Sequence, residues 1–332
     1  MTKLSQAQAA KYLLKLRDAS DSFEGFVRLC YPDWVIADFQ LELIDALDKL
    51  EKGTLGTDNL LVTMPPRHAK STFSTVLFPS YFMARNSHRY IMSCSYNSQL
   101  ATDFGRQVRG VVEQQIMNQA FPDFSLSKES RAADVWRTDQ GGAYFAVGVG
   151  GTTSGRPANL LIVDDPIKSR EDAESMTQRN KTWNYYTSAL ATRLQPQSDG
   201  SNAKQIIILT RWHPDDLAGR LMDSEDWKEG RWSHINFPAI KKINGKKVSR
   251  RHLAEDDPRW VDSKTFQNLS HKKRYIHEEE EESLWEERFP LEDLKRRERL
   301  NPREFASLYQ QQPYIEGGNL IKTEWWQKYP KD

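Results

Sequence analysis

Cysteine is scarce in this sequence, the charges nearly cancel, and there is no long apolar run. Cys30 and Cys94 are the only cysteines in 332 residues, which excludes a disulfide framework and a four-thiolate zinc site and favours a reducing setting. The formal net charge is +1 although 28% of the residues are charged, so contacts with nucleic acid must come from local clusters. A signal peptide is absent, as is the stretch of ~20 apolar residues that spans a membrane. We expect a soluble cytoplasmic protein without membrane contact.

The spacing of apolar residues divides the chain. In residues 1–55 apolar side chains such as Leu13 and Leu14 follow helical intervals and Gly53 provides a stop signal, so we predict a helical N-terminal segment. Short runs rich in β-branched residues follow, each succeeded by a polar or helix-forming segment: NLLVTM, YIMSCSY, LLIVDD and QIIILT. This alternation predicts an α/β core over residues 56–240, with a mostly parallel central sheet flanked by helices. One more strand and a loop are predicted in GGAYFAVGVGGTTSGRPAN.

Beyond this core the composition becomes strongly charged. Residues 241–283 contain the basic cluster KKINGKKVSRR and the acidic run HEEEEES without a convincing strand, and we predict a charged, lid-like insertion there. The glutamate run is most simply a solvated face. Residues 284–332 include LEDLKRRERLNPREFASLYQQQP, which predicts a C-terminal helical segment.

The stretch MPPRHAKST, residues 64–72, ends as a phosphate-binding loop does. In such a loop, backbone amides surround the β-phosphate, a lysine bridges the β- and γ-phosphates, and a hydroxyl binds Mg²⁺. Lys70 and Ser71 occupy these side-chain positions, and the amides of residues 68–72 are the expected donors. The two prolines cannot donate an amide hydrogen, but they lie at the start of the loop, before the donors.

Two positions of this stretch depart from the GxxxxGK[ST] pattern. Met64 and Ala69 stand where the pattern has glycine. If position 69 requires a positive φ, alanine there costs on the order of 1 kcal/mol relative to glycine. Taken alone, the stretch fits equally well a strand that ends in a turn with an incidental Lys-Ser-Thr. Other parts of the chain must decide between these interpretations.

Two further strand ends carry polar residues suited to the same chemistry. LLIVDD ends in Asp164 and Asp165, and in nucleotide hydrolases the first such acid holds Mg²⁺ while the next polarises the attacking water. QIIILT ends in Thr210, a hydroxyl placed to sense a γ-phosphate or its water. Alone, the aspartates could cap a helix or turn, and an ordinary capped helix could follow Thr210. The combination with the upstream Lys-Ser-Thr favours a nucleotide site.

Four motifs together resemble the large terminase subunits of tailed bacteriophages, the motors that package viral DNA. MPPRHAKS is similar to the family's proline- and arginine-rich phosphate loop, and LLIVDDPIKS is similar to its Walker B segment. LTRWHPDDLAG resembles its coupling motif, and FPLEDLKRRERLNPREFASLYQQQP resembles the segment that closes its ATPase domain. The resemblance covers most of residues 38–313. It implies a P-loop NTPase of the RecA-like (ASCE) class with ATP and Mg²⁺ as cofactors.

The resemblance assigns roles to particular residues. The implied ATP contacts, with the first at the adenine, are Gln40, Arg67, His68, Ala69, Lys70, Ser71 and Thr72. Ser71 and Asp164 would hold Mg²⁺, and Asp165 would orient the water as the general base. The family more often has glutamate at position 165, and aspartate is one methylene shorter.

Two further implied roles concern movement and the transition state. Thr210 would couple hydrolysis to movement. Ring motors also need an arginine near the γ-phosphate to stabilise charge in the transition state. Arg156, in a glycine-rich loop, is the candidate, acting in its own subunit or in the next one. Arg67 is its rival for a role within the subunit.

The function implied is ATP-driven translocation of double-stranded DNA into a procapsid. The implied partners are DNA, contacted at its phosphate backbone, further copies of the chain in a ring, the portal protein and the small terminase subunit. Candidate DNA contacts are KKINGKKVSRR and KRRER, although the second could simply complete a charged helix. The chain stops about where the family's nuclease domain begins, so we expect no nuclease site. The setting implied is the host cell cytoplasm, transiently at the portal.

Two other functions remain open at this point. YIMSCSYNSQLATDFGRQVRGVV also resembles the strand and helix with which helicase-like ATPases grip nucleic acid, although such an enzyme needs a second motor domain. Alternatively, a P-loop fold could bind nucleotide or DNA as a scaffold without turnover. Met64, Ala69 and the short acid Asp165 would fit that second alternative.

Overall fold

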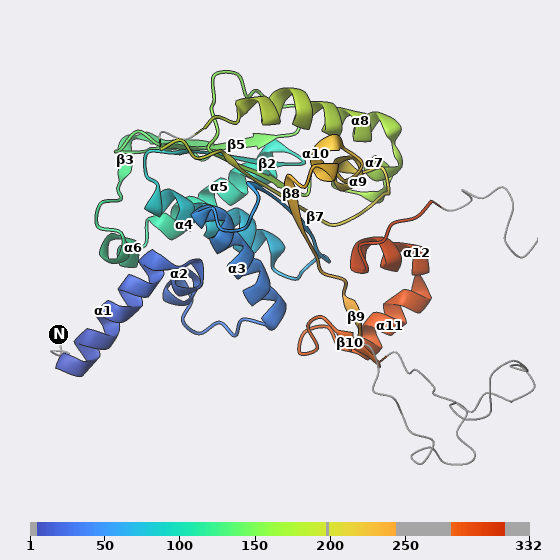
Figure 1. Ribbon diagram of the computed structural model, residues 1–332, viewed down its shortest axis with the longest axis horizontal. Helices are drawn as coiled ribbons and strands as arrows, with labels where there is room; N and C mark the ends of the chain where they lie inside the picture. The colour runs from blue at the N-terminus through green and yellow to red at the C-terminus, as the bar shows by residue number, and fades with distance from the viewer. Residues whose placement is uncertain (1–4, 197–198, 244–279, 316–332) are drawn as a thin grey trace, which may run out of the picture.

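The computed structural model describes residues 5–196, 199–243 and 280–315. Its centre is an eight-stranded sheet (Figure 1). In spatial order the strands are β3 (Leu126–Arg131), β4 (Val135–Thr138), β5 (Ala143–Gly148), β2 (Tyr90–Ser95), β6 (Leu160–Asp164), β7 (Lys204–Leu209), β1 (Asn59–Thr63) and β8 (Trp232–Asn236). From β5 to β8 the neighbours run parallel, while β3 and β4 pair antiparallel at one edge.

This sheet confirms the predicted α/β fold. The four apolar runs of the sequence became β1, β2, β6 and β7, and the fifth predicted strand is β5. Sequence reasoning missed β3, β4 and β8, whose sequences LSKESR, VWRT and WSHIN are short and interrupted by polar residues. They lie toward the edges of the sheet, where burial is incomplete and the apolar signal is correspondingly weak.

Helices cover both faces of the sheet (Figure 1). One face packs against α1 (Gln6–Asp21), α2 (Phe23–Cys30), α3 (Asp38–Lys52), a π-helical segment (Thr72–Leu77), α4 (Phe78–Arg85), α5 (Ser98–Val112) and α6 (Gln115–Ala120). The other packs against α8 (Met176–Tyr185), its π-helical extension (Tyr186–Leu190) and α9 (Leu217–Met222), with α7 (Arg170–Glu174) and α10 (Glu225–Lys228) alongside. Leu60 and Val62 of β1 enter the first core and Leu61 the second, because successive strand residues face opposite sides.

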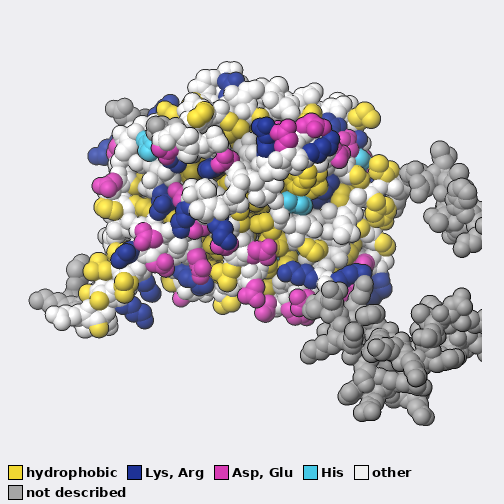
Figure 2. Space-filling view, in the orientation of Figure 1, with side chains coloured by type: hydrophobic (Ala, Val, Ile, Leu, Met, Phe, Trp, Pro, Cys, Tyr) yellow, Lys and Arg dark blue, Asp and Glu magenta, His cyan; other side chains and the backbone are white. Residues whose placement is uncertain are grey.

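The N-terminal helices behave in part as expected. Gly53 ends α3 with φ 69°, the left-handed geometry that glycine adopts without strain. Leu13 and Leu14, however, lie on an exposed side of α1 and are 64% and 65% exposed. Figure 2 shows hydrophobic side chains on this protruding helix at the lower left. Among the described residues, no helix is both long and apolar enough to cross a membrane.

A small C-terminal unit follows β8. It contains a two-stranded antiparallel sheet of β9 (Ile240–Ile243) and β10 (Glu280–Ser283), then α11 (Leu291–Leu300), α12 (Pro302–Glu304) and a π-helical segment (Phe305–Tyr309). The expectation that residues 241–283 hold no strand was therefore wrong at both ends. Part of the glutamate run is also not simply solvated, because Glu281 forms an ion pair with Lys295 at 2.7 Å. Residues 244–279, the bulk of the predicted insertion, and residues 316–332 lie outside the described residues.

Candidate functional site

The turn after β1 adopts an unusual backbone. Arg67 and Ala69 have φ values of 63° and 65°, in the left-handed region that favours glycine. The structure thus answers the question left by the sequence: Ala69 takes the strained geometry. The chain becomes helical at Lys70, so the amides of this turn and of the first helical residues lie at a helix start. Such amides point outward and attract anions.

Lys70 forms the centre of a buried polar cluster. Its Nζ lies 2.6 Å from Oδ2 of Asp165 and donates to Oγ1 of Thr210 at 3.0 Å. Burial favours the neutral amine, but the Asp165 and Asp164 carboxylates outweigh it and raise the pKa of Lys70. The three predicted residues come from the ends of β1, β6 and β7, which are neighbours in the sheet. The sheet order therefore brings together what the sequence keeps far apart.

Asp165 connects this cluster to the backbone. Its Oδ1 accepts a hydrogen bond from the Thr210 amide at 2.9 Å, and the Thr210 hydroxyl donates to the Met64 carbonyl at 3.1 Å. Asp165 has φ 41°, a region in which aspartate and asparagine are several-fold enriched over other residues with a side chain. This geometry gives a physical reason for aspartate at position 165, where the family that the sequence resembles more often has glutamate.

Asp164 has the surroundings of a metal ligand. It is 1% exposed, its Oδ2 accepts from the Thr75 hydroxyl at 2.7 Å, and its Oδ1 has no hydrogen-bond partner among the described residues. Burial raises its pKa to about 6 and the Asp165 charge adds to this, against the opposing influence of Lys70, Ser71 and Thr75. A buried, bare carboxylate oxygen beside the Ser71 hydroxyl fits Mg²⁺, which uses few protein ligands and completes its shell with water and phosphate oxygens.

Thr75 is a site residue that the sequence reasoning missed. It lies within the π-helical segment that follows the turn and is fully buried. The signal in the sequence was a hydroxyl four residues after Ser71, on the helix that follows a phosphate loop, a spacing that returns to the same helix face. Only the position of β6 shows that this face meets Asp164.

A hollow of about 220 Å³ opens in front of Lys70. It is lined by Pro66, Lys70, Tyr96, Leu100, Asp165, Ile167, Lys168, Thr210, Trp212 and Leu308. Leu308 belongs to the C-terminal π-helical segment, which sequence reasoning did not connect with the site. A second hollow of about 240 Å³ shares Tyr96, Ile167 and Lys168 with the first and is also lined by Lys181.

His68 faces an aromatic cluster. Its ring stacks on Phe289 at 4.6 Å between centroids and meets Phe39 and Trp285 edge-on or tilted. Nδ1 lies 2.9 Å from the Pro66 carbonyl and therefore carries the proton, while burial lowers the pKa of His68 to about 4. The imidazole is thus committed to packing, and only the His68 backbone amide is available for the predicted phosphate contact.

Two predicted site residues lie apart from the Lys70 cluster. Gln40 is buried and its Oε1 accepts from the Ala37 amide at 3.0 Å, so its side chain caps α3, although the adjacent Phe39 touches His68. The Arg156 guanidinium lies 5.5 Å from the centroid of the Phe145 ring on β5. Among the described residues, no contact joins the Arg156 side chain to Lys70, Asp165 or Thr210.

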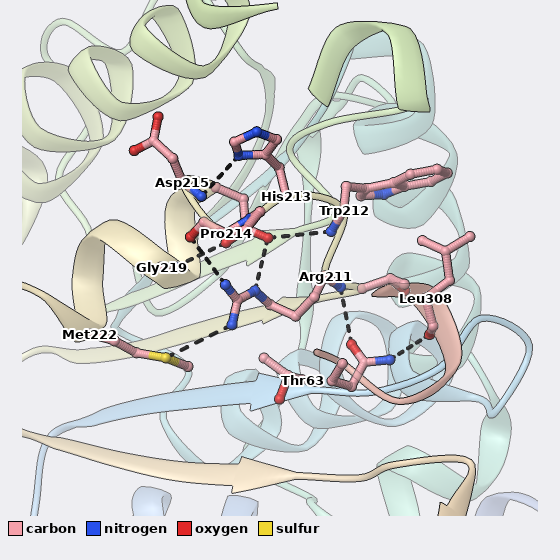
Figure 3. A network of polar contacts seen from close by, with 12 residues as sticks. Thr63, Arg211, Trp212, His213, Pro214, Asp215, Gly219, Met222 and Leu308 are labelled. Atoms are coloured by element: carbon pink, nitrogen blue, oxygen red, sulfur yellow. Dashed lines mark hydrogen bonds and ion pairs between the residues drawn. The ribbon is translucent and has the colours of Figure 1, made fainter. Parts of the chain in front are cut away.

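The segment after Thr210 forms a polar network (Figure 3). Nε of Arg211 donates to Oδ2 of Asp216 at 2.9 Å within a buried ion pair, and Oδ1 of Asp216 caps α9 through the Gly219 amide at 2.9 Å. The capped helix expected in HPDDLAGRL is thus present. The same segment is also adjacent to the site, because Thr210 precedes it and Trp212 lines the hollow.

Comparison with solved structures found a phage protein with a similar fold. The HK97 bacteriophage large terminase superposes with a TM-score of 0.51 and 15% identity, covering 89% of this chain and 55% of that one. This chain has the fold of a phage large terminase. It spans about half the length of that structure.

Two further phage large terminases superpose less closely. One is from a thermophilic bacteriophage, in complex with ADP, with a TM-score of 0.38, 11% identity and coverage of 61% of this chain and 46% of that one. The other is a mutant form of the large terminase ATPase domain of a Thermus phage, with a TM-score of 0.41, 12% identity and coverage of 66% and 86%. No protein-family model and no curated protein sequence matches the chain.

Proposed function

We propose that this chain is the ATP-hydrolysing motor domain of a DNA-packaging terminase of a tailed bacteriophage. The observation that carries the proposal is the convergence of Lys70, Asp165 and Thr210 at the ends of three adjacent strands, beside the bare Oδ1 of Asp164. The arrangement offers the three kinds of group that phosphoryl transfer uses: a cation for phosphate, an acid for water and a metal-side acid. The fold shared with the HK97 large terminase supports it.

ATP occupies the hollow in front of Lys70 in this proposal. The amides of the turn, from His68 to Thr72, surround the β-phosphate, and Lys70 leaves Asp165 to bind the phosphates. Ser71 and Asp164 would hold Mg²⁺, which would supply positive charge to the phosphates during transfer. Release from Lys70 leaves the Asp165 carboxylate free to accept a hydrogen bond from the attacking water. As the water oxygen bonds to the γ-phosphorus, the bond from that phosphorus to the bridging oxygen breaks, ADP leaves and Asp165 takes up the proton of the water.

Arg156 acts across a subunit boundary in this proposal. Its side chain lies over Phe145 of β5 and contacts none of the Lys70 cluster, which supports contact with a γ-phosphate in the next copy of a ring. Mixing two inactive chains tests this. Equal amounts of Lys70→Ala and Arg156→Ala should regain about a quarter of the wild-type turnover, because in random neighbours half the sites keep Lys70 and half of those face an intact Arg156. No recovery at any ratio would contradict action in trans.

In this proposal the motor domain moves double-stranded DNA and contacts it at its phosphates. Of the two basic clusters in the sequence, most of KKINGKKVSRR lies outside the described residues, and KRRER is partly paired through Lys295 with Glu281 and Arg296 with Asp293. Lys181 lines the second hollow and Lys168 lines both hollows. Neither forms an ion pair within the described part of the chain, and the two are better candidates. The portal protein and the small terminase subunit are the further proposed partners, in the host cell cytoplasm.

The DNA contact has its own test. Replacing Lys168 and Lys181 by alanine should make the negative slope of log K against log salt for duplex DNA shallower by about 1 to 2. A double variant of Lys11 and Lys15, which lie exposed on α1, is the matched control and should leave the slope unchanged. Equal slopes for wild type and both double variants would show that Lys168 and Lys181 do not contact DNA.

The central experiment is phosphate release with ATP, Mg²⁺ and duplex DNA at high protein concentration. Wild type should turn over ATP, and Lys70→Ala should lose turnover because the cation that contacts the phosphates is removed. The competing function is a scaffold that binds nucleotide without hydrolysis, favoured by the strained Ala69 and by Lys70 being already engaged with Asp165. Nucleotide binding with no turnover, even in an enforced ring, would support the scaffold and contradict the motor.

A further inference from the structure

Two consecutive backbone amides at the end of β7 bind acceptors from distant parts of the chain. The Thr210 amide donates to Oδ1 of Asp165 at 2.9 Å, and the Arg211 amide donates to Oε1 of Gln311 at 3.0 Å. Gln311 lies 100 positions away, in the C-terminal unit. The candidate base therefore holds the peptide before Thr210, and the C-terminal unit holds the peptide after it, between Thr210 and Arg211.

The surroundings of Gln311 fix its side chain at the peptide between Thr210 and Arg211. It is 5% exposed and has φ 57°, a left-handed geometry that a residue with a side chain adopts only under tertiary constraint. Its carboxamide uses both of its functions: the oxygen accepts from the Arg211 amide, and Nε2 donates to the carbonyl of Leu308. Glutamine supplies one acceptor and one donor at this distance from the backbone, which alanine does not.

The rest of the Arg211 residue is anchored on the opposite side. Figure 3 shows the Arg211 side chain directed toward Pro214 and Met222, while its amide faces the segment that carries Leu308. With the side chain fixed by the buried pair with Asp216, the position of the Arg211 amide depends on Gln311. A displaced Arg211 amide shifts the shared peptide and hence Thr210, which contacts both Lys70 and Asp165.

We propose that Gln311 is a positioning residue of the active site, through which the C-terminal unit sets the place of Thr210 and Asp165. The inference rests on the proposed ATPase function. In it, the Gln311 contact is required for turnover and not for nucleotide binding. The phosphate-binding groups belong to the turn after β1, whereas the Thr210 peptide orients the acid that activates water.

A second anchor of the C-terminal unit provides a control for simple docking. Arg170 forms a two-point ion pair with Glu304, at 2.9 and 2.7 Å, and also donates to the Trp212 carbonyl. Glu304→Gln weakens this anchor without touching the Arg211 amide. Gln312, the next residue after Gln311, is exposed, so Gln312→Ala is a matched control of the same residue type.

The test compares kcat, KM and ATP affinity for wild type, Gln311→Ala, Gln311→Glu, Gln312→Ala and Glu304→Gln, after checking that each melts cooperatively. Gln311→Ala should lower kcat about 10- to 100-fold with ATP affinity changed by less than about twofold. Gln312→Ala and Glu304→Gln should keep kcat. Gln311→Glu, also the substitute if the alanine variant fails to fold, should regain kcat as the pH falls from about 8 to about 6, because a protonated carboxyl restores both donor and acceptor.

Two outcomes would overturn the inference while leaving the ATPase proposal intact. One is wild-type kcat in Gln311→Ala. The other is an equal loss of kcat in Glu304→Gln, which would reduce Gln311 to one docking contact among several. A wild-type chain that binds no ATP would instead contradict the proposed function, and this inference with it.

Discussion

The Nζ of Lys70 lies 2.6 Å from Oδ2 of Asp165, so the cation proposed to bind phosphate and the candidate base form an ion pair. The Lys70 side chain is 9% exposed and that of Asp165 29%. Under the proposed function, ATP phosphates compete with Asp165 for Lys70, so nucleotide binding and release of the candidate base are coupled.

Asp165→Asn separates these two roles. The amide oxygen still accepts from Thr210, but the negative charge that competes for Lys70 is gone. We expect ATP binding to tighten by up to about tenfold, since a partly buried ion pair contributes on the order of 1 kcal/mol. Turnover should fall at least ~100-fold because the base is lost. A fluorescent nucleotide titration and a phosphate-release assay measure the two effects.

Asp223→Asn serves as the control for Asp165→Asn. Asp223 is exposed just after α9 and lies outside the hollow in front of Lys70. It should change neither affinity nor turnover. Weaker ATP binding in Asp165→Asn would show that the Lys70–Asp165 pair does not compete with the phosphates.

Thr75→Val removes the hydroxyl that holds Asp164 while keeping the side-chain shape. A second carboxylate oxygen of Asp164 then lies buried without a partner, which should cost about 1 to 3 kcal/mol of the free energy of unfolding at about pH 8. The loss should shrink at about pH 5, below the pKa of about 6 for Asp164, because the protonated carboxyl needs less solvation. Denaturant unfolding at both pH values measures it.

Thr75→Ser keeps the hydroxyl and provides the comparison. It should retain most of the stability lost in the valine variant, apart from the missing methyl group. The Mg²⁺ concentration required for half-maximal ATP binding should rise in Thr75→Val and stay near wild type in Thr75→Ser. Equal Mg²⁺ requirements in both variants would show that the Thr75 hydroxyl does not contribute to Mg²⁺ binding.

Ala69→Gly should stabilise the chain, against the usual direction for a change from alanine to glycine. Ala69 has φ 65°, which costs a residue with a side chain about 1 to 2 kcal/mol, and glycine relieves this while adding freedom to the unfolded chain. The expected net gain is about 0.5 to 1 kcal/mol in the free energy of unfolding. Ala10→Gly, in exposed α1, should instead cost about 1 kcal/mol. Losses of equal size at both positions would contradict the left-handed turn.

Stability should also fall between about pH 6.5 and pH 4 because of His68. Its pKa is lowered from 6.5 to about 4 in the fold, so in this window the unfolded chain binds a proton that the folded chain does not. At about pH 7.5 both states are neutral and the loss is absent. At the acid end it approaches roughly 3 kcal/mol, at about 1.4 kcal/mol per pKa unit.

His68→Phe is the variant that isolates this dependence. It keeps an aromatic ring against Phe289 but cannot titrate, so unfolding free energies measured from about pH 7.5 to 4.5 should fall less steeply than in wild type. Some stability is lost at every pH because the hydrogen bond to the Pro66 carbonyl disappears. An unchanged slope would show that His68 is not held neutral.

Local patterns along the chain were enough to establish the class of fold and most of the candidate site. Short β-branched runs identified β1, β2, β6 and β7, because a buried parallel strand must be apolar on both faces. Polar residues at the ends of such runs identified Lys70, Asp164, Asp165 and Thr210. The edge strands β3 and β8 were missed because polar residues interrupt their short sequences, and the strands beside the insertion were missed because they are charged.

Which residues meet became visible only in three dimensions. Lys70 and Thr210 lie 140 positions apart, and their contact depends on the order of strands in the sheet, which local periodicity does not encode. The contact of Thr75 with Asp164 and that of Gln311 with the Arg211 amide likewise depend on the tertiary arrangement. The left-handed φ of Ala69 was a question that the sequence could pose but not answer, because packing around the turn, and not the residue itself, sets that angle.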